Sequence, residues 1–301
     1  MLELSGVSRS FGEVHALDGV SFTVQRGRLT GFVGGNGAGK TTAMRIVLGV
    51  LSADAGTVTL DGRRLDAPIR RTFGYMPEER GLYPRMKVAE QLAYLAQLHG
   101  LDRGTADRRA RELLERLGLT GRADDRLDTL SLGNQQRAQI AAALVHAPGL
   151  LVLDEPFSGL DPIAVDTVMG VLSERAQAGA PVLFSSHQLD VVERLCDDLV
   201  IIAGGHIVAA GEREELRARY TEPRHRLRAP GDLAWVGAVP GVVVLERSPG
   251  EALFEADDAA AQRVLTEALA RGPVTEFAPV RPSLAEIFRE VVRDETPAVA
   301  A

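Results

Sequence analysis

The chain has 301 residues, of which 45% are hydrophobic, and its 34 basic and 41 acidic side chains give a net charge of −7. This length allows one large domain with a smaller one, and the acidic excess argues against a general nucleic-acid binder, which carries a basic surface. The single cysteine, Cys196, excludes an internal disulfide and suits a reducing compartment. The first residues lack the pattern of a secretory signal, and no apolar run reaches the roughly 18–20 residues that cross a bilayer.

The first two thirds of the chain carry the element pattern of an α/β domain. Alternating apolar residues predict strands in "LELSGVSRSF", "VSFTVQRG", "LTGFVGG" and "AGTVTLDGR". Apolar residues at three- and four-residue spacing then predict helices in "VAEQLAYLAQLHG", "ADRRARELLERLGL" and "QQRAQIAAALVHAP". The apolar runs "GLLVLDEP" and "APVLFSSH" are typical of parallel strands covered on both faces, with a crossover helix capped by Asp161 between them. We expect an α/β core over residues 1–215, with a helical insertion over residues 85–147.

The last third of the chain has a different pattern, which begins after "EREELRARY". We predict strand "HRLRA", helix "DLAWVGA", strands "VVVLER" and "EALFEA", helix "DAAAQRVLTEALARG" and strand "VTEFAPV". This β-α-β-β-α-β order favours a small α+β domain of ferredoxin-like type over residues 224–292. A last helix, "SLAEIFREVVR", precedes a tail over residues 293–301 that we expect to be flexible.

A phosphate-binding loop is predicted at residues 34–42. The segment "GGNGAGKTT" fits G-x-x-x-x-G-K-[ST] and lies between a predicted strand and a predicted helix. Glycines allow the backbone to turn its N–H groups toward phosphate oxygens, while the following helix N-terminus favours negative charge. Lys40 can reach the β- and γ-phosphates, and the Thr41 hydroxyl can bind Mg²⁺. The residues that we expect to bind the nucleotide here are Gly34, Asn36, Gly37, Ala38, Gly39, Lys40, Thr41 and Thr42.

Two carboxylates end the buried run "LLVLDEP". We expect Asp154 to hold Mg²⁺ and Glu155 to act as the general base toward an attacking water. The pair favours phosphoryl transfer to water over transfer to a small substrate. The alternative, two acids that only cap a turn, is weakened by the phosphate loop.

These segments together resemble the nucleotide-binding subunit of an ABC transporter over residues 1–215. "LSLGNQQR" is similar to that family's signature motif, "LLVLDEP" to its Walker B strand and "SGLD" to its D-loop. The resemblance implies a P-loop NTPase core with a mixed sheet, ATP and Mg²⁺ as ligands, and ATP hydrolysis. It also implies that His187 in "SSHQLD" contacts the γ-phosphate and steadies the water at Glu155, and that Phe11 stacks on adenine.

The resemblance also implies the partners of the chain. In this family two ATPase domains face each other head to tail, so Ser131 and Gly133 of one copy would cover ATP bound to the other copy. Ser131 can also serve as a helix N-cap, and the two roles are compatible. A separately encoded permease would hold the dimer at the cytoplasmic face of the membrane, gripped by the helical insertion and the "PEERGLYP" loop, and no nucleic acid is expected.

Two departures from the family pattern affect the expected chemistry. Glu78 stands where the family has a glutamine that touches Mg²⁺ and water; a carboxylate can still bind the metal, but it adds negative charge beside Asp154 and Glu155. We therefore hypothesise slower or more metal-dependent turnover, the alternative being a solvated charge in a turn. In the signature, Leu132 replaces a glycine and Asn134 a glutamine, while Gly133 is kept.

Within the family, the chain resembles ATPase subunits of the drug- or ion-export type. The alternative is a soluble ABC-type ATPase that acts on a nucleic-acid or ribosomal partner, but such proteins carry long coiled coils or two ATPase units, and neither pattern is present. A P-loop kinase or GTPase would leave "LSLGNQQ" unexplained. The transported substrate is not encoded in this chain, and the C-terminal domain has three open roles: regulation, dimerisation or bracing of the ATPase.

Overall fold

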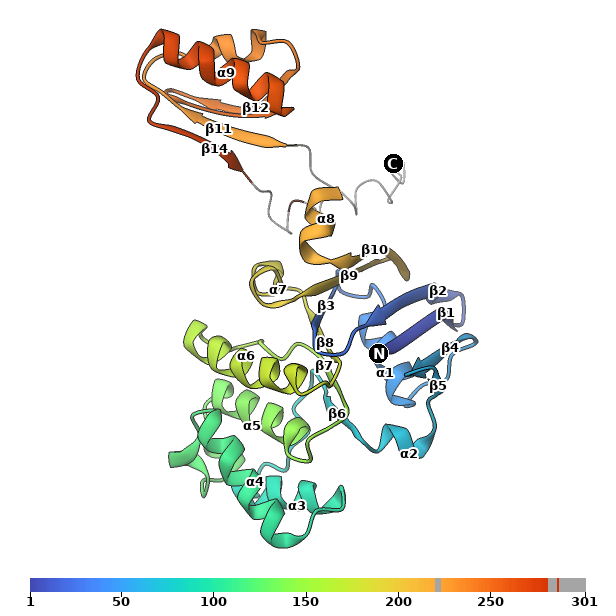
Figure 1. Cartoon of the computed structure of the whole chain (residues 1–301). Helices are drawn as coiled ribbons and strands as arrows, with labels where there is room; N and C mark the ends of the chain where they lie inside the picture. Colours follow the sequence, from blue (N-terminus) through green and yellow to red (C-terminus); the bar gives the residue numbers. More distant parts are fainter. Residues whose placement is uncertain (220–222, 281–285, 287–301) are drawn as a thin grey trace. The chain divides into compact units, whose positions relative to one another are not determined.

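The computed structural model of the protein describes residues 1–219, 223–280 and 286 (Figure 1). Its contacts divide the chain into two compact units, Met1–Arg213 and Glu214–Ala301, which are described separately below. The predicted helix "SLAEIFREVVR" and the tail over residues 293–301 lie outside the described residues, apart from Glu286. Within the described part of the chain, no helix is long and apolar enough to cross a membrane.

The centre of the first unit is a mixed six-stranded sheet in the order β10-β9-β3-β8-β7-β6. The strands from β9 to β6 run parallel, and β10 pairs antiparallel with β9. Strands β3, β7 and β8 are buried along their whole length, as expected for parallel strands covered on both faces. The bounds are β3 Leu29–Val33, β6 Phe73–Met76, β7 Leu150–Leu153, β8 Val182–Ser186, β9 Asp198–Ala203 and β10 His206–Glu212.

An antiparallel sheet in the order β2-β1-β4-β5 packs beside the first one, with one hydrophobic core between them. Its strands are β1 Leu2–Phe11, β2 Val14–Val24, β4 Ala55–Leu60 and β5 Arg63–Arg64. An Asp-Gly turn at the end of the segment "AGTVTLDGR" joins β4 to β5, with φ of 52° at Asp61 and 75° at Gly62. Helix α1 (Lys40–Leu48) contributes buried side chains to the same core, which fixes the loop that precedes it.

Helices cover the six-stranded sheet and form a group of their own below it in Figure 1. The group of α3, α4 and α5 is mutually packed, and α5 also contacts β6 and α6. Asp161 caps α6 as predicted, since its side chain accepts a hydrogen bond from the Ala164 N–H at 2.8 Å. The bounds are α2 Ala67–Arg70, α3 Val88–Leu98, α4 Arg103–Arg116, η1 Thr120–Arg122, η2 Leu127–Thr129, α5 Leu132–Leu144, α6 Pro162–Gln177 and α7 Leu189–Leu195. Helix α8, Arg213–Arg219, begins at the last residue of this unit and otherwise belongs to the second unit.

The buried Cys196, which follows α7, packs where β3 passes beneath that helix. A Cβ added at Gly31 of β3 would lie 2.6 Å from a Val192 methyl group and 3.6 Å from the Cys196 sulfur. Burial raises the pKa of this thiol to about 12. Cys196 is therefore a small core residue.

The second unit is a four-stranded antiparallel sheet in the order β12-β13-β11-β14. This is the strand order of a ferredoxin-like unit, and helix α9 packs with the apolar side chains of the sheet into a separate core. The predicted helix "DLAWVGA" is wrong in type, because a five-residue 3₁₀ segment, which Gly237 and the nearby Pro240 keep short, takes its place. The bounds are β11 Arg224–Arg228, η3 Ala234–Ala238, β12 Val242–Ser248, β13 Glu251–Ala256, α9 Asp258–Arg271 and β14 Glu276–Val280.

Candidate functional site

The predicted phosphate loop connects the end of β3 to the start of α1. Two of its glycines are required by packing: a Cβ at Gly34 would lie 2.4 Å from the Ile202 carbonyl oxygen, and one at Gly39 would lie 2.5 Å from the Ala16 carbonyl oxygen. Gly39 also has φ of 110°, which a residue with a side chain rarely adopts. The loop is thus pressed between β9 and the segment around Ala16, with the N-terminus of α1 opening into it.

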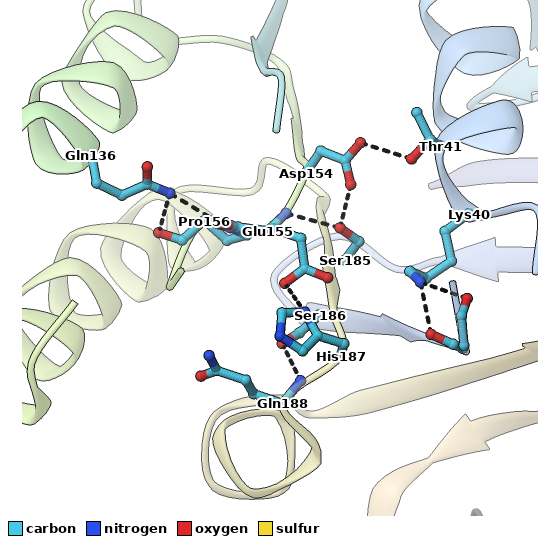
Figure 2. Close-up of polar contacts among 12 residues, drawn as sticks. Lys40, Thr41, Gln136, Asp154, Glu155, Pro156, Ser185, Ser186, His187 and Gln188 are labelled. Atoms are coloured by element: carbon cyan, nitrogen blue, oxygen red, sulfur yellow. Dashed lines mark hydrogen bonds and ion pairs between the residues drawn. The ribbon is translucent and has the colours of Figure 1, made fainter. Parts of the chain in front are cut away.

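Lys40 is the first residue of α1, and only 8% of it is exposed. Its Nζ donates hydrogen bonds to the carbonyl oxygens of Gly34 at 2.7 Å and Gly35 at 3.1 Å (Figure 2). The ammonium group therefore lies inside the curve of the loop. When a phosphate binds there, its charged oxygens would replace the neutral carbonyl oxygens as hydrogen-bond partners of the ammonium group.

Asp154 follows β7 and is almost fully buried, with 2% exposure. Its carboxylate accepts hydrogen bonds from the Ser185 hydroxyl at 2.5 Å and from the Thr41 hydroxyl at 3.1 Å. Among the described residues it has no cationic partner, so its charge is met by hydroxyl groups alone. This charge acts on Tyr75 of β6, whose pKa is raised first by burial and then by Asp154. A buried, uncompensated carboxylate beside a hydroxyl suits a hard cation such as Mg²⁺.

Glu155 is fixed by contacts to its backbone as well as to its side chain. Its N–H donates to the Ser185 hydroxyl at 2.9 Å, and its carbonyl accepts from Gln136 Nε2 at 3.0 Å. These contacts hold the backbone at φ of 51°, in the left-handed region that a non-glycine residue enters only under constraint. The carboxylate then points toward His187, whose Nδ1 lies 3.0 Å from Glu155 Oε2 (Figure 2).

These groups line one cavity of about 660 Å³. Its walls bring together most of the predicted site residues with Ala16; they are Asn36, Gly37, Ala38, Gly39, Lys40, Thr41, Thr42, Glu78, Asp154, Glu155 and His187. One side of the cavity carries a cation and the N-terminus of α1, and the other carries carboxylates. Gly34 lies behind the loop and contributes only its carbonyl to Lys40.

The loop that carries Glu78 is held by the signature helix, α5. Gln139 is 4% exposed, and its amide donates to the carbonyl oxygens of Pro77 at 2.7 Å and Glu79 at 3.2 Å. Since these carbonyls flank Glu78 on both sides, one side chain of α5 sets the position of the predicted metal-site carboxylate.

Besides Gly34, three predicted residues do not line the cavity: Ser131, Gly133 and Phe11. Ser131 and Gly133 lie at the exposed start of α5, where the Ser131 hydroxyl caps the helix by accepting from the Asn134 N–H at 3.4 Å. Gly133 lies against the D-loop, since an added Cβ there would be 3.4 Å from the Gly159 carbonyl oxygen. Phe11 ends β1 with 46% exposure, and the Arg9 guanidinium lies 5.0 Å from the centre of its ring.

Two residues that position the acids are absent from the sequence-based prediction, Ser185 and Gln136. Ser185 bonds to both Asp154 and Glu155, because β7 and β8 are neighbours and their carboxyl ends meet at one edge of the sheet. The polar end of the apolar run "VLFSS" was the available signal. Gln136 is buried on α5 and donates to the carbonyl oxygens of Glu155 and Pro156, so a glutamine on an apolar helix face was the signal there.

Comparison with known proteins agrees with this geometry. A family described as "ABC transporter" matches residues 17–158, and one described as "ATP-binding protein DrrA1-3-like, C-terminal domain" matches residues 211–292. The ABC transporter ATP-binding protein YhaQ of Bacillus subtilis is 36% identical over 97% of this chain and 98% of its own length. The chain belongs to the ATP-binding proteins of ABC transporters. It is thus an ATP-binding and ATP-hydrolysing subunit that powers such a transporter.

Two further similarities refine this family assignment. The linearmycin resistance ATP-binding protein LnrL of Bacillus subtilis is 35% identical, over 73% of this chain and 71% of LnrL. A solved structure described as the ATP-binding subunit of an ABC transporter has a TM-score of 0.68 and 34% identity, covering 73% of this chain and 93% of that one. This agrees with the predicted P-loop core of the ABC type.

Proposed function

We propose that the 660 Å³ cavity binds MgATP and that a second copy of the chain completes it. The observation that carries this proposal is the convergence of Lys40, Asp154, Glu155 and His187 from separate elements on one cavity. The N–H groups of residues 36–42 and Lys40 would hold the phosphates, and the exposed ring of Phe11 is available to stack on adenine. Thr41, Asp154 and Glu78 supply the oxygen atoms that would hold Mg²⁺, which neutralises phosphate charge when bound.

In this proposal Glu155 accepts a proton from the attacking water, because its carboxylate lies at the acidic wall opposite Lys40. His187 keeps the carboxylate in place through its Nδ1 contact at 3.0 Å, and its Nε2, which has no hydrogen bond to any of the residues that the structure describes, would face the γ-phosphate. Ser185 and Gln136 fix the backbone of Glu155, so the base needs little reorganisation during the reaction.

The dimer follows from where Ser131 and Gly133 lie. Both are away from the cavity of their own chain, on a surface that also carries Leu132 and Ile163 with 60% and 81% exposure. Close approach of a second copy would place the uncrowded start of α5 over its ATP and cover these apolar side chains.

We also assign the ATPase domain to residues 1–215, its helical insertion to residues 85–147 and the accessory domain to residues 224–292.

Mixing two inactive variants tests this composite site. Lys40→Ala removes the phosphate-loop cation, and Ser131→Arg blocks the signature, so each variant alone is expected to lack ATPase activity. In an equal mixture, about a quarter of the native rate should return, because half of the dimers are mixed and each of those holds one intact site. Continued inactivity of the mixture, with both variants folded, would contradict the composite site and leave an intrachain site.

We further propose that the chain works at the cytoplasmic face of the membrane, bound to a separate permease, and that transport is outward. The loop before α3 and the outer face of α3 support this proposal, since Tyr83, Tyr94 and Leu98 are 60%, 43% and 65% exposed. Gln91 holds the loop against α3: its Oε1 accepts from the Tyr83 N–H at 2.6 Å, and its Nε2 donates to the Tyr83 carbonyl at 3.3 Å. These bonds fix the backbone that carries the exposed Tyr83 side chain. The relation to LnrL favours export.

Co-purification with the permease encoded by the adjacent gene tests this surface. Tyr83→Glu with Leu98→Glu should abolish association while the ATPase rate of the free subunit stays native. Truncation after Tyr220, with ATPase activity and permease association both measured, tests the open roles of the C-terminal domain: if both are unchanged, regulation and dimerisation lose support. If the double variant still binds the permease, the contact surface lies elsewhere.

A further inference from the structure

A second cavity, of about 300 Å³, lies between α4, α5 and α6. It is separate from the ATP cavity: its lining comes from the last residues of α5 and the segment before β7, whereas Asp154 follows the opposite end of β7. Its volume is at the lower end of the range for small-molecule sites, roughly 300–1,000 Å³. The lining combines an apolar wall of Leu113, Leu144 and Val171 with the guanidinium groups of Arg109, Arg116 and Arg175.

The charges around this cavity are unevenly compensated. Arg116 pairs with Glu174 on the facing helix, which neutralises both. Glu112 is also part of the lining, but its ion pair is with Arg108, one turn back on α4, at 3.9 Å. Within the described part of the chain, Arg109 has no hydrogen bond or ion pair, although its side chain is only partly exposed.

The positive charge of Arg175 has only neutral carbonyl groups as hydrogen-bond partners. Its guanidinium donates to the Pro148 carbonyl at 2.9 Å and to the Ala147 carbonyl at 3.1 Å, and no carboxylate of the described residues pairs with it. Burial and then the neighbouring charge of Arg109 lower the pKa of Arg175. Two guanidinium groups that disfavour each other therefore face one cavity, and a bound anion would relieve this repulsion with charge-assisted hydrogen bonds.

From this arrangement we infer that the cavity between α4, α5 and α6 binds a small amphipathic anion, with its carboxylate or phosphate at Arg109 and Arg175 and its apolar part against Leu113, Leu144 and Val171. The combination of one anionic and one apolar wall distinguishes this ligand class from inorganic anions and from neutral apolar molecules. The ligand would contact α5 at the end opposite Ser131, so it lies on the same helix that begins with the signature.

Binding of octanoate to the full-length protein tests the inference. With MgADP saturating the nucleotide site, methyl NMR signals of Leu113, Leu144 and Val171 should shift in a saturable manner. Arg109→Gln should weaken octanoate binding about tenfold, the effect of one lost charge-assisted contact, whereas Arg111→Gln, an exposed arginine of α4 outside the cavity, should leave it native. Because Arg109 makes no hydrogen bond or ion pair within the described part of the chain and its charge disfavours Arg175, its variant should keep at least the native unfolding temperature.

Two further probes define the ligand class. Octan-1-ol has the same chain without the charge, and inorganic phosphate has the charge without the chain; both should bind at least about tenfold more weakly than octanoate. Equal binding of octanol, equal binding of phosphate, or native affinity in Arg109→Gln would each overturn the inference. So would the absence of any saturable shift up to about 10 mM octanoate, the weak limit for a specific small ligand.

Discussion

Glu155 combines a buried carboxylate with a backbone conformation that side chains rarely adopt. The hydroxyl of Ser185 and the amide of Gln136 hold its peptide groups on either side, and the result is a carboxylate aimed at His187. A left-handed residue costs about 1–2 kcal/mol, so the surrounding contacts must impose this geometry. The strain is local to the predicted base, where it removes alternative side-chain directions.

Glu78 is the residue where the chemistry should differ from family members that carry glutamine. It lines the same cavity as Asp154 and Glu155, so three carboxylates line one cavity. Glu78→Gln should raise the ATPase rate at saturating Mg²⁺ by about fivefold, because the negatively charged MgATP then meets one carboxylate fewer, which removes roughly 1 kcal/mol of like-charge repulsion. Rates measured across a Mg²⁺ titration check this, with Glu79→Gln, which does not line the cavity, as the control. Equal rates at every Mg²⁺ concentration would show that Glu78 is a solvated charge.

His146 should make the stability of the protein sensitive to acid. The pKa of His146 is lowered to about 4, mainly by burial and to a smaller degree by the charge of His99. The two rings are stacked, with 3.6 Å between their centres. Between that pKa and the ordinary 6.5, the unfolded chain binds a proton that the folded chain does not, so the free energy of unfolding falls as pH falls through this window. Its contribution is intact above pH 6.5.

Chemical denaturation at pH 7 and pH 4.5 measures this effect. His146→Gln should lose less stability on acidification than the native chain, by less than about 1 kcal/mol per pH unit because the ring is partly exposed. His206→Gln, at an exposed position in β10, is the matched control and should follow the native chain. An identical acid response in the native chain and His146→Gln would remove His146 as the cause.

At the scale of elements, α5 connects several parts of the ATP site. Ser131 caps its exposed end, Gln136 holds the backbone of Glu155, and Gln139 holds the loop of Glu78. Both glutamines face inward among apolar residues, so their amides are committed to these carbonyls. A displacement of the exposed end of α5 is therefore transmitted to both the predicted base and the predicted metal-site loop.

Gln139→Leu should uncouple the Glu78 loop from α5. The carbonyls of Pro77 and Glu79 would lose their donor, which lowers the free energy of unfolding by about 1–3 kcal/mol. The Mg²⁺ concentration that gives half-maximal ATPase activity should rise severalfold, a readout that simple destabilisation would not move. Gln97→Leu, which removes the hydrogen bond that the exposed Gln97 donates to the Ala93 carbonyl on its own helix, is the control. An unchanged Mg²⁺ midpoint would reduce Gln139 to a packing role.

The sequence was sufficient to predict elements whose residue pattern extends over many consecutive positions. It was insufficient for short elements and for residues whose role depends on which strand lies beside them in the sheet. The helices α3 to α6 have clear periodicity, and the phosphate loop has a fixed spacing, so both could be predicted. Strand β6 is only Phe73–Met76, too short for a pattern. Ser185 could not be assigned because its role depends on β8 lying beside β7, and the order of strands in a sheet is not written in either strand.

At the scale of the whole molecule, Leu132 and Ile163 predict a dimer face. Ile163→Glu should block ATP-dependent dimerisation without unfolding the chain, since an acidic residue in the first turn of α6 is favourable there. Sedimentation with ATP in a Glu155→Gln background, where hydrolysis is slowed, should show dimers that weaken at least about tenfold on adding Ile163→Glu. Val50→Glu, at another exposed apolar residue with 68% exposure, is the control. Undiminished dimers would place the contact away from α6.

The burial of Cys196 beneath α7 has a practical consequence for labelling the protein. With a pKa of about 12, its thiolate fraction at pH 8 is only about one part in ten thousand, and the thiol is enclosed as well. The natural chain therefore needs no cysteine removed before a probe is attached. A thiol introduced at an exposed position would be the sole reactive group, so fluorescent or spin labels can report the approach of two copies in an otherwise unaltered subunit.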